Sequence, residues 1–315
     1  MDYRLLGDTG LMVSRLCFGT LTMGPLQAKL PIEEGASLLC EAFDRGVNFI
    51  DTAELYNNYE YIKQGTKGRR DKVIISTKSY AFSKETAEAS LQKALKEINS
   101  DYIDIFSLHE QESAHTIRGH MEALEYLIQA KEKGYIRAIG ISTHAVAAVE
   151  AALHYPEVQV LHPIINMAGL GIIDGTAQDM LQAIEKAVKQ GKGIYSMKAL
   201  GGGNLMHNAK ECFAFVLGNQ NIHSVAVGMQ SKAEILNNIA VFEGREAEVE
   251  IQKQLSNRKR KLMIDYWCTG CGSCCDKCQQ KAIGLMDGKA VVNSDKCVLC
   301  GYCSAYCPDF CIKII

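Results

Sequence analysis

Two cysteine runs with the same spacing constrain the end of the chain more tightly than any other feature of the sequence. The first is CxxCxxCxxxC through Cys268, Cys271, Cys274 and Cys278, and the second repeats it through Cys297, Cys300, Cys303 and Cys307. Ten of the 13 cysteines lie between Cys268 and Cys311. The opening residues show no signal peptide, so this density predicts metal binding in a reducing compartment rather than disulfides.

Each run resembles the cysteine pattern of bacterial two-cluster ferredoxins, in which the fourth cysteine of a run reaches the other cluster. The resemblance implies one [4Fe–4S] cluster on Cys268, Cys271, Cys274 and Cys307, and a second on Cys297, Cys300, Cys303 and Cys278. The first run departs from the pattern at Gln279, where proline is usual. Zinc held by Cys268, Cys271, Cys297 and Cys300 is the alternative, but it leaves four regularly spaced cysteines unexplained. Cys275 and Cys311 are left over and are expected to be packing thiols.

A β-hairpin is predicted between the two runs, because IGLMDGKAVV alternates apolar positions around a DG turn. Residues 265–315 are therefore expected to form a small α+β ferredoxin-like domain, whose core needs a staple. Residues 251–264 are expected to be a charged helix or linker. Its basic run, 258–261, is interpreted as a solvent-facing surface, with a docking patch for an acidic electron carrier as the alternative.

Upstream of this domain, short apolar runs alternate with helical patterns. The runs cover 13–18, 47–51, 72–77, 102–108, 137–142, 158–165, 193–198 and 224–228. Eight strand and helix units in about 230 residues predict an α/β fold, a (β/α)8 TIM barrel over residues 1–250. A doubly wound open sheet is the alternative, but no GxGxxG follows the first run. Ser83 is expected to cap the helix that begins after it.

Polar residues stand where the predicted strands end, which is where barrels of this kind build their active sites. Asp51, Lys78, His109 and Ser142 occupy such positions, and Tyr56 lies five residues beyond Asp51. A carbonyl that accepts hydride needs a proton donor. Tyr56 could supply the proton if Lys78 lowers the pKa of its phenol from about 10 toward neutrality. Asp51 would hold Lys78, and His109 would orient the carbonyl oxygen.

These motifs resemble the aldo-keto reductase family from residue 1 to about residue 242. YRLLGDTGLMVSRLCFGT resembles its barrel-plugging hairpin and first strand, GYIRAIGISTH resembles its nicotinamide-contacting segment, and DTAELY with Lys78 and His109 resembles its catalytic tetrad. The resemblance implies carbonyl and alcohol interconversion on a small molecule, with NAD(H) or NADP(H) as cofactor. The cofactor contacts that it implies are Ser142, Asn166, Met197, Lys198, Leu200, Gly228, Ser231, Glu234 and Asn238.

The chain departs from the family at several cofactor positions. His162 stands where the family commonly has Gln, and Met197 stands where an aromatic residue usually stacks on the nicotinamide. Glu234 would repel a 2′-phosphate, which favours NADH, although Lys232 could still bind that phosphate. The glycines 201–203 are interpreted either as a place where backbone amides approach a pyrophosphate or as a flexible loop.

The leading functional prediction is an iron-sulfur oxidoreductase whose barrel converts a carbonyl and whose clusters transfer electrons, with a ferredoxin as a possible partner. The alternatives are a plain NAD(P)H reductase with structural clusters, and an electron-transfer protein that uses the barrel as a scaffold. A net charge of -2 argues against nucleic acid, and no apolar run predicts a membrane span. A cytoplasmic location is expected. Flavin would help to couple hydride to single electrons, but no sequence feature declares a flavin site.

Overall fold

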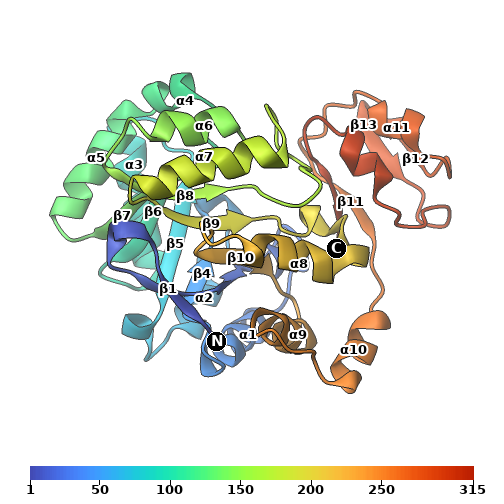
Figure 1. The fold of residues 1–315 in the computed structure, drawn as a ribbon, viewed down its shortest axis with the longest axis horizontal. Coiled ribbons are helices and arrows are strands. Elements are labelled where there is room, and N and C mark those ends of the chain that lie inside the picture. The colour runs from blue at the N-terminus through green and yellow to red at the C-terminus, as the bar shows by residue number, and fades with distance from the viewer.

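A closed parallel barrel forms the larger part of the computed structural model, which describes residues 1–315 (Figure 1). The strand order around the barrel is β10-β3-β4-β5-β6-β7-β8-β9. The strands are β3 (Leu16–Gly19), β4 (Phe49–Asp51), β5 (Ile74–Ser79), β6 (Ile103–Leu108), β7 (Ile136–Thr143), β8 (Val158–Pro163), β9 (Gly193–Met197) and β10 (Ser224–Gly228). The predicted (β/α)8 architecture is therefore confirmed.

Helices surround this barrel on the outside (Figure 1). They are α1 (Ile32–Asp44), α2 (Tyr59–Gly65), α3 (Lys84–Ile98), α4 (Ala114–Gly119), α5 (Met121–Glu132), α6 (Val146–Ala152), α7 (Ala177–Lys189), α8 (Ala209–Gly218), α9 (Lys232–Phe242) and α10 (Val249–Ser256). Ser83 caps α3 as predicted, because its side chain accepts a hydrogen bond from the Thr86 amide. The apolar faces of helices and strands together bury one core of 53 residues.

A hairpin of β1 (Tyr3–Leu5) and β2 (Met12–Ser14) precedes the barrel. Leu6, Leu11 and Val13 from this segment belong to a second buried cluster, which includes Phe49 and Tyr195 inside the barrel. The hairpin therefore plugs the end at which the strands begin, as the family resemblance implied. The strand predicted for 13–18 is divided, because its first two residues belong to β2 and the barrel strand begins at Leu16.

The cysteine-rich unit lies beside the barrel, at the red end of the colour scale (Figure 1). It contains β11 (Leu262–Ile264), α11 (Ser273–Lys277), β12 (Ile283–Met286), β13 (Lys289–Val292), a 3-10 turn at Tyr302–Tyr306 and β14 (Ile312–Ile314). The predicted hairpin is β12 paired with β13, and Asp287 and Gly288 both have positive φ in its turn. Residues 262–264, expected in the linker, instead form β11 and pair with β14. We call residues 262–315 the tail.

The tail docks on the barrel through a glycine turn, Gly201–Gly203, that follows β9. A Cβ atom on Gly203 would lie 2.0 Å from the Ile314 carbonyl oxygen, and one on Gly202 would lie 2.7 Å from Lys313 Cδ. Asn204 Nδ2 adds a hydrogen bond of 3.0 Å to the Ile312 carbonyl oxygen. The two glycines thus allow close approach of β14, a reason that neither sequence interpretation of this turn included. None of the helices has the length and apolar character needed to span a membrane.

Candidate active site and cysteine cavities

A buried ion pair lies where β4 and β5 end. Lys78 Nζ donates hydrogen bonds to Asp51 Oδ1 at 2.6 Å and to the Thr52 carbonyl oxygen at 2.8 Å. The same ammonium lies 5.3 Å from the centre of the Tyr56 ring. The Tyr56 ring meets His109 edge to face, with ring centres 6.1 Å apart. The four residues predicted as a catalytic tetrad are therefore brought together at one end of the barrel.

The electrostatics of Tyr56 differ from the sequence prediction. Burial, followed by the Asp51 carboxylate, raises the pKa of Tyr56 well above its usual value of 10. Lys78 donates its hydrogen bonds to Asp51 and Thr52. The expectation that the Tyr56 pKa falls toward neutrality is therefore wrong in this structure, because burial and Asp51 outweigh the nearby Lys78. Tyr56 consequently remains protonated at neutral pH, so its phenol hydrogen is available for donation.

His109 is buried, and its ring stacks on Tyr80 with centres 4.4 Å apart. Burial, followed by the Lys78 ammonium, lowers the pKa of His109 well below 6.5, so the imidazole is neutral. Its Nδ1 atom is buried and has no hydrogen-bond partner within the protein. Buried polar atoms of side chains rarely lack a partner. The tetrad therefore contains a neutral ring with hydrogen-bonding capacity that the protein itself does not use.

Tyr195 and His162 complete the surroundings of Asp51. The Tyr195 hydroxyl donates to Asp51 Oδ1 at 2.9 Å, and the Ser76 hydroxyl lies 2.8 Å from the same phenol oxygen. His162 stacks on Tyr195 with ring centres 3.9 Å apart, and its Nε2 is 3.7 Å from Asp51 Oδ1. Sequence reasoning missed Tyr195, although it precedes Met197 by two residues on β9 and so shares a strand face with it.

The tautomer of His162 follows from its partners. Its Nδ1 is 2.7 Å from the Tyr195 carbonyl oxygen, which can only accept, so Nδ1 bears the hydrogen. Burial lowers the pKa of His162 to about 4, against the opposing effect of Asp51. His162 is therefore neutral, with an unprotonated Nε2 on the side of Asp51. It is thus a polar group of the site, beside Asp51 and Tyr195.

A cavity of about 300 Å³ opens above the ion pair. Asp51, Tyr56 and His162 line it from the barrel. The predicted cofactor contacts that also line it are Met197, Lys198, Leu200, Gly228, Glu234 and Asn238. Residues from five different segments of the chain thus meet around one space, next to the side chains that are suited to proton transfer.

The remaining predicted contacts, Ser142, Asn166 and Ser231, do not line this cavity. The Ser142 hydroxyl accepts a hydrogen bond of 2.9 Å from the Glu110 amide. Asn166 makes two hydrogen bonds of 2.9 Å to the backbone of Leu170, and Ser231 caps α9. In this structure the three side chains hold the loops and helix that border the site.

The basic run 258–261 is only partly exposed. Arg258 pairs with Glu234 and also donates to Gln230, and both Arg258 and Arg260 line the cavity. The prediction that this run faces solvent is therefore wrong for two of its four residues. Glu234 is neutralised by Arg258, so its charge no longer favours NADH over NADPH. Lys232, the other candidate for a phosphate contact, pairs instead with Glu41 at 3.1 Å.

The tail contributes one wall of the cavity. Lys313, Ile314 and Ile315 line it together with Asp51 and Tyr56. The backbone of Ile315 exchanges two hydrogen bonds with Lys261, which fixes this segment beside β11. The site is therefore shared between the barrel and the tail.

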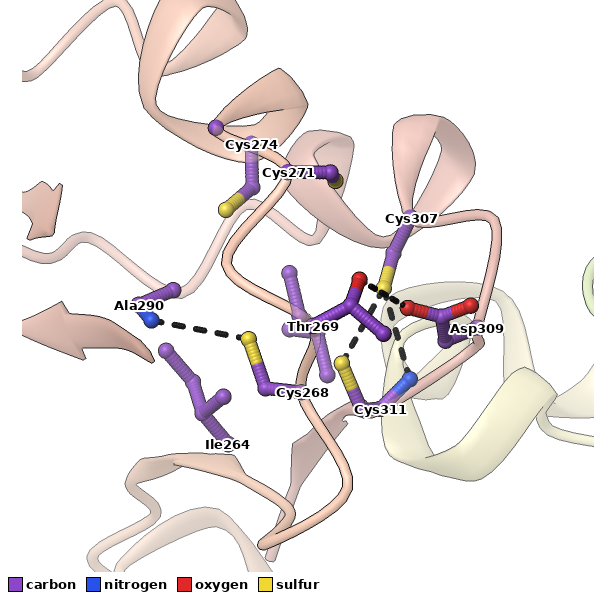
Figure 2. A pocket seen from close by; sticks show the side chains of 11 residues that line it. Ile264, Cys268, Thr269, Cys271, Cys274, Ala290, Cys307, Asp309 and Cys311 are labelled. Atoms are coloured by element: carbon purple, nitrogen blue, oxygen red, sulfur yellow. Dashed lines mark hydrogen bonds between the residues drawn. The ribbon is translucent and has the colours of Figure 1, made fainter. Parts of the chain in front are cut away.

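Two further cavities lie inside the tail, and cysteines line both. Cys268, Cys271, Cys274, Cys307 and Cys311 surround the first, which Figure 2 shows. Cys278, Cys297, Cys300 and Cys303 surround the second. Each cavity thus combines three cysteines of one run with the last cysteine of the other. The four cysteines of the zinc alternative are divided between the two cavities.

Backbone amides point at several of these sulfur atoms. The Ala290 amide donates to Cys268 Sγ at 3.5 Å (Figure 2). The Gly270 amide donates to the same sulfur at 3.4 Å, and the two donors lower the pKa of Cys268. The Cys307 and Cys278 sulfurs each accept from one amide as well. Amide donors of this kind suit thiolate ligands of iron-sulfur clusters. Of the two leftover cysteines, Cys275 lines neither cavity, whereas Cys311 lines the first.

Comparisons with known proteins identify the class to which this fold and site belong. The chain matches the sequence profile of the Aldo/keto reductase family over residues 15–214 and that of the 4Fe-4S binding domain over residues 290–313. The first match covers more than half of the chain, so the chain belongs to the aldo-keto reductase family. It is an oxidoreductase of that type, with a ferredoxin-type segment in its tail.

Individual relatives agree with this assignment. The chain is 25% identical over 298 residues to L-galactose dehydrogenase from Arabidopsis thaliana, across 81% of this chain and 92% of the relative. It is 31% identical to the oxidoreductase YqkF from Bacillus subtilis, but over about half of each protein, 45% and 49%. The crystal structure of PA4992 from Pseudomonas aeruginosa, described as an aldo-keto reductase, gives a TM-score of 0.67 at 28% identity. That match covers 77% of this chain and 95% of PA4992.

Proposed function

We propose that this protein interconverts a carbonyl and an alcohol in the barrel cavity, with NADH or NADPH as hydride donor. The observation that supports this most directly is the Asp51–Lys78 pair beneath Tyr56, next to a cavity that Tyr56 itself lines. When bound, the dinucleotide supplies the hydride. The protein must then provide the proton and stabilise the charge that develops on the carbonyl oxygen.

Tyr56 is the proposed proton donor, because its raised pKa keeps the phenol protonated until the oxygen of the substrate becomes basic. Lys78 stabilises the negative charge that remains on Tyr56 after the transfer. Asp51 holds Lys78 in place and is itself held by the Tyr195 hydroxyl. The neutral His109 ring, with its unused Nδ1, is proposed to orient the carbonyl oxygen.

The dinucleotide is proposed to lie along Met197, Leu200 and Gly228, toward Glu234 and Asn238 on α9, all of which line the cavity. Thioether side chains pack well against aromatic rings, so Met197 suits a nicotinamide. Arg260 adds a guanidinium group at the α9 end that a 2′-phosphate could bind. The choice between NADH and NADPH is tested by comparing their KM values in the parent protein and in Arg260→Gln.

The proposed chemistry is tested by Tyr56→Phe, measured with an aromatic aldehyde and NADH or NADPH. We expect kcat to fall about 10²–10⁴-fold, the usual contribution of a positioned acid, with cluster absorbance and melting temperature unchanged. Tyr135→Phe is the matched control, because Tyr135 is exposed and lines none of the three cavities. Full activity in Tyr56→Phe would remove this residue from the mechanism.

We further propose that the two cysteine cavities hold two [4Fe–4S] clusters, with Cys307 serving the first run and Cys278 serving the second. The support is the division of the eight cysteines between the cavities and the amides that donate to their sulfurs. In this proposal the clusters staple the tail and thereby hold β14 against the cavity. Bound clusters can carry single electrons, but a structural role in the tail requires no electron transfer.

Electron transfer between the clusters and the cavity is the second candidate role, and one observation favours it. Phe310, three residues after Cys307, packs against the barrel side chains His144 and Lys198. A path from a cluster ligand to the cavity would pass through this contact, and an electron carrier such as a ferredoxin would be the partner. Bleaching of the cluster absorbance by NADH or NADPH under anaerobic conditions would support it. Cluster absorbance that stays unchanged during carbonyl turnover would exclude electron transfer between the clusters and the cavity.

A further inference from the structure

Two lysines in the cavity have no part in the tetrad. Lys198 follows β9, and Lys313 lies in β14 of the tail; both line the cavity together with Tyr56. Both ammonium groups lie over the Phe310 ring, at 5.0 Å and 3.7 Å from its centre. Lys198 Nζ is also 2.8 Å from His144 Nε2. The barrel and the tail thus each contribute one cation to the same corner of the site.

No carboxylate lies within hydrogen-bond distance of either lysine to balance its charge. Lys198 forms no ion pair, and Lys313 has only Asp265, at 3.8 Å, which is beyond hydrogen-bond distance. Asp265 Oδ2 itself is buried and has no hydrogen-bond partner. Buried ammonium groups without a full partner are costly, and a bound anion would remove that cost. This corner of the cavity therefore favours an anionic ligand.

The pKa values of the two lysines and the backbone conformation around them agree with an anion site. Burial, followed by the Lys313 ammonium, lowers the pKa of Lys198 to about 7, and burial lowers that of Lys313 to about 8. Lys198 and Phe310 also have positive φ, 59° and 45°, which is uncommon outside glycine. Strained backbone of this kind clusters at functional sites.

We propose that Lys198 and Lys313 bind the carboxylate of the substrate, so that the cavity takes small oxo acids or the corresponding hydroxy acids. This inference rests on the proposed carbonyl chemistry, because Tyr56 lines the same cavity and would act on the other end of the molecule. The residues proposed for the adenosine half, Glu234, Asn238 and Arg260, belong to α9 and the segment after α10. Lys198 instead contacts His144 and the Phe310 ring of the tail.

The test compares 4-carboxybenzaldehyde with its neutral methyl ester, using the intact protein with its clusters. We expect Lys198→Met and Lys313→Met each to raise KM for the acid about ten- to a hundredfold, the usual range for a charged hydrogen bond, and to leave KM for the ester within about twofold. Lys198→Arg should restore part of the preference because it keeps the charge. Lys253→Met on α10, which is exposed, is the matched control.

Two results would overturn the inference. One is an equal change in KM for the acid and the ester. The other is weaker binding of NADH or NADPH with an unchanged ratio between acid and ester, because it would assign the lysines to the pyrophosphate. Calorimetric titration with terephthalate separates this inference from the proposed reaction. If no carbonyl is reduced but terephthalate binds and Lys198→Met abolishes that binding, the carboxylate site stands and the proposed reaction fails.

Discussion

The barrel and the tail hold their functional side chains in different ways. The barrel places Asp51, Lys78 and Tyr195 inside a scaffold whose main core has 53 buried residues. The core of the tail has eight buried residues, and four of these are cysteines, Cys268, Cys274, Cys303 and Cys311. Apolar packing alone can stabilise the first unit, whereas the second is too small to do so without its proposed clusters. The side chains proposed for catalysis are thus held by the barrel core, while one wall of the cavity depends on the tail.

Removal of the clusters should show this difference most strongly. We expect an iron chelator to unfold the tail and leave the barrel folded, because metal binding supplies most of the folding free energy of such units. Hydrogen exchange resolved by segment measures this directly. Amides of β12 and β13 should lose protection, and amides of β6 and β7 should keep it. Equal loss in both units would show that the barrel also depends on the clusters.

Asp51→Asn should have the next largest effect, and it should act on the barrel. The variant leaves the buried Lys78 without its carboxylate, which typically costs about 3–5 kcal/mol. Chemical denaturation followed by circular dichroism measures the free energy of unfolding. Glu150→Gln is the control, because its pair with Lys186 is exposed and should contribute under about 1 kcal/mol. Similar values for the two variants would contradict the importance of the buried pair.

The preference for a carboxylate should depend on pH. A lysine binds an anion only while it is charged, so the ratio of kcat/KM for 4-carboxybenzaldehyde to that for its ester should be largest below about pH 6 and fall as the pH rises past 7 and 8. The charged and titratable groups that act on Lys198 are Lys313, Glu110, Asp265, Lys78 and His144. A ratio that stays flat from pH 6 to pH 9 would contradict binding by these lysines.

Tyr195→Phe should give the smallest effect. The variant removes one hydrogen bond to Asp51 but keeps the ring that stacks on His162. We expect a loss of about 1–3 kcal/mol in the free energy of unfolding, since the bond involves a charged acceptor, and a modest fall in kcat. Thermal unfolding and steady-state kinetics measure both. A fall in kcat as large as that of Tyr56→Phe would instead show that the position of Asp51 depends on this hydrogen bond.

The sequence predicted the barrel and the tetrad because both depend on local order along the chain. Strand periodicity located the eight strands, and their ends located Asp51, Lys78 and His109. The raised pKa of Tyr56 could not be predicted, because it depends on how deeply the folded chain buries the phenol and how near Asp51 lies. Arg260 was missed for a similar reason, since nothing local shows that the chain folds back over α9. The close approach of β14 to Gly203 likewise exists only in three dimensions.

In the proposed function, the barrel performs the chemistry and the cluster-stapled tail completes the cavity. Steady-state kinetics of carbonyl reduction before and after removal of the clusters tests this claim most directly. We expect KM for 4-carboxybenzaldehyde to rise at least tenfold, since Lys313 is displaced, while kcat at saturation stays within a few-fold. Loss of kcat with unchanged KM would contradict the account, because it would mean that the clusters take part in the chemical step.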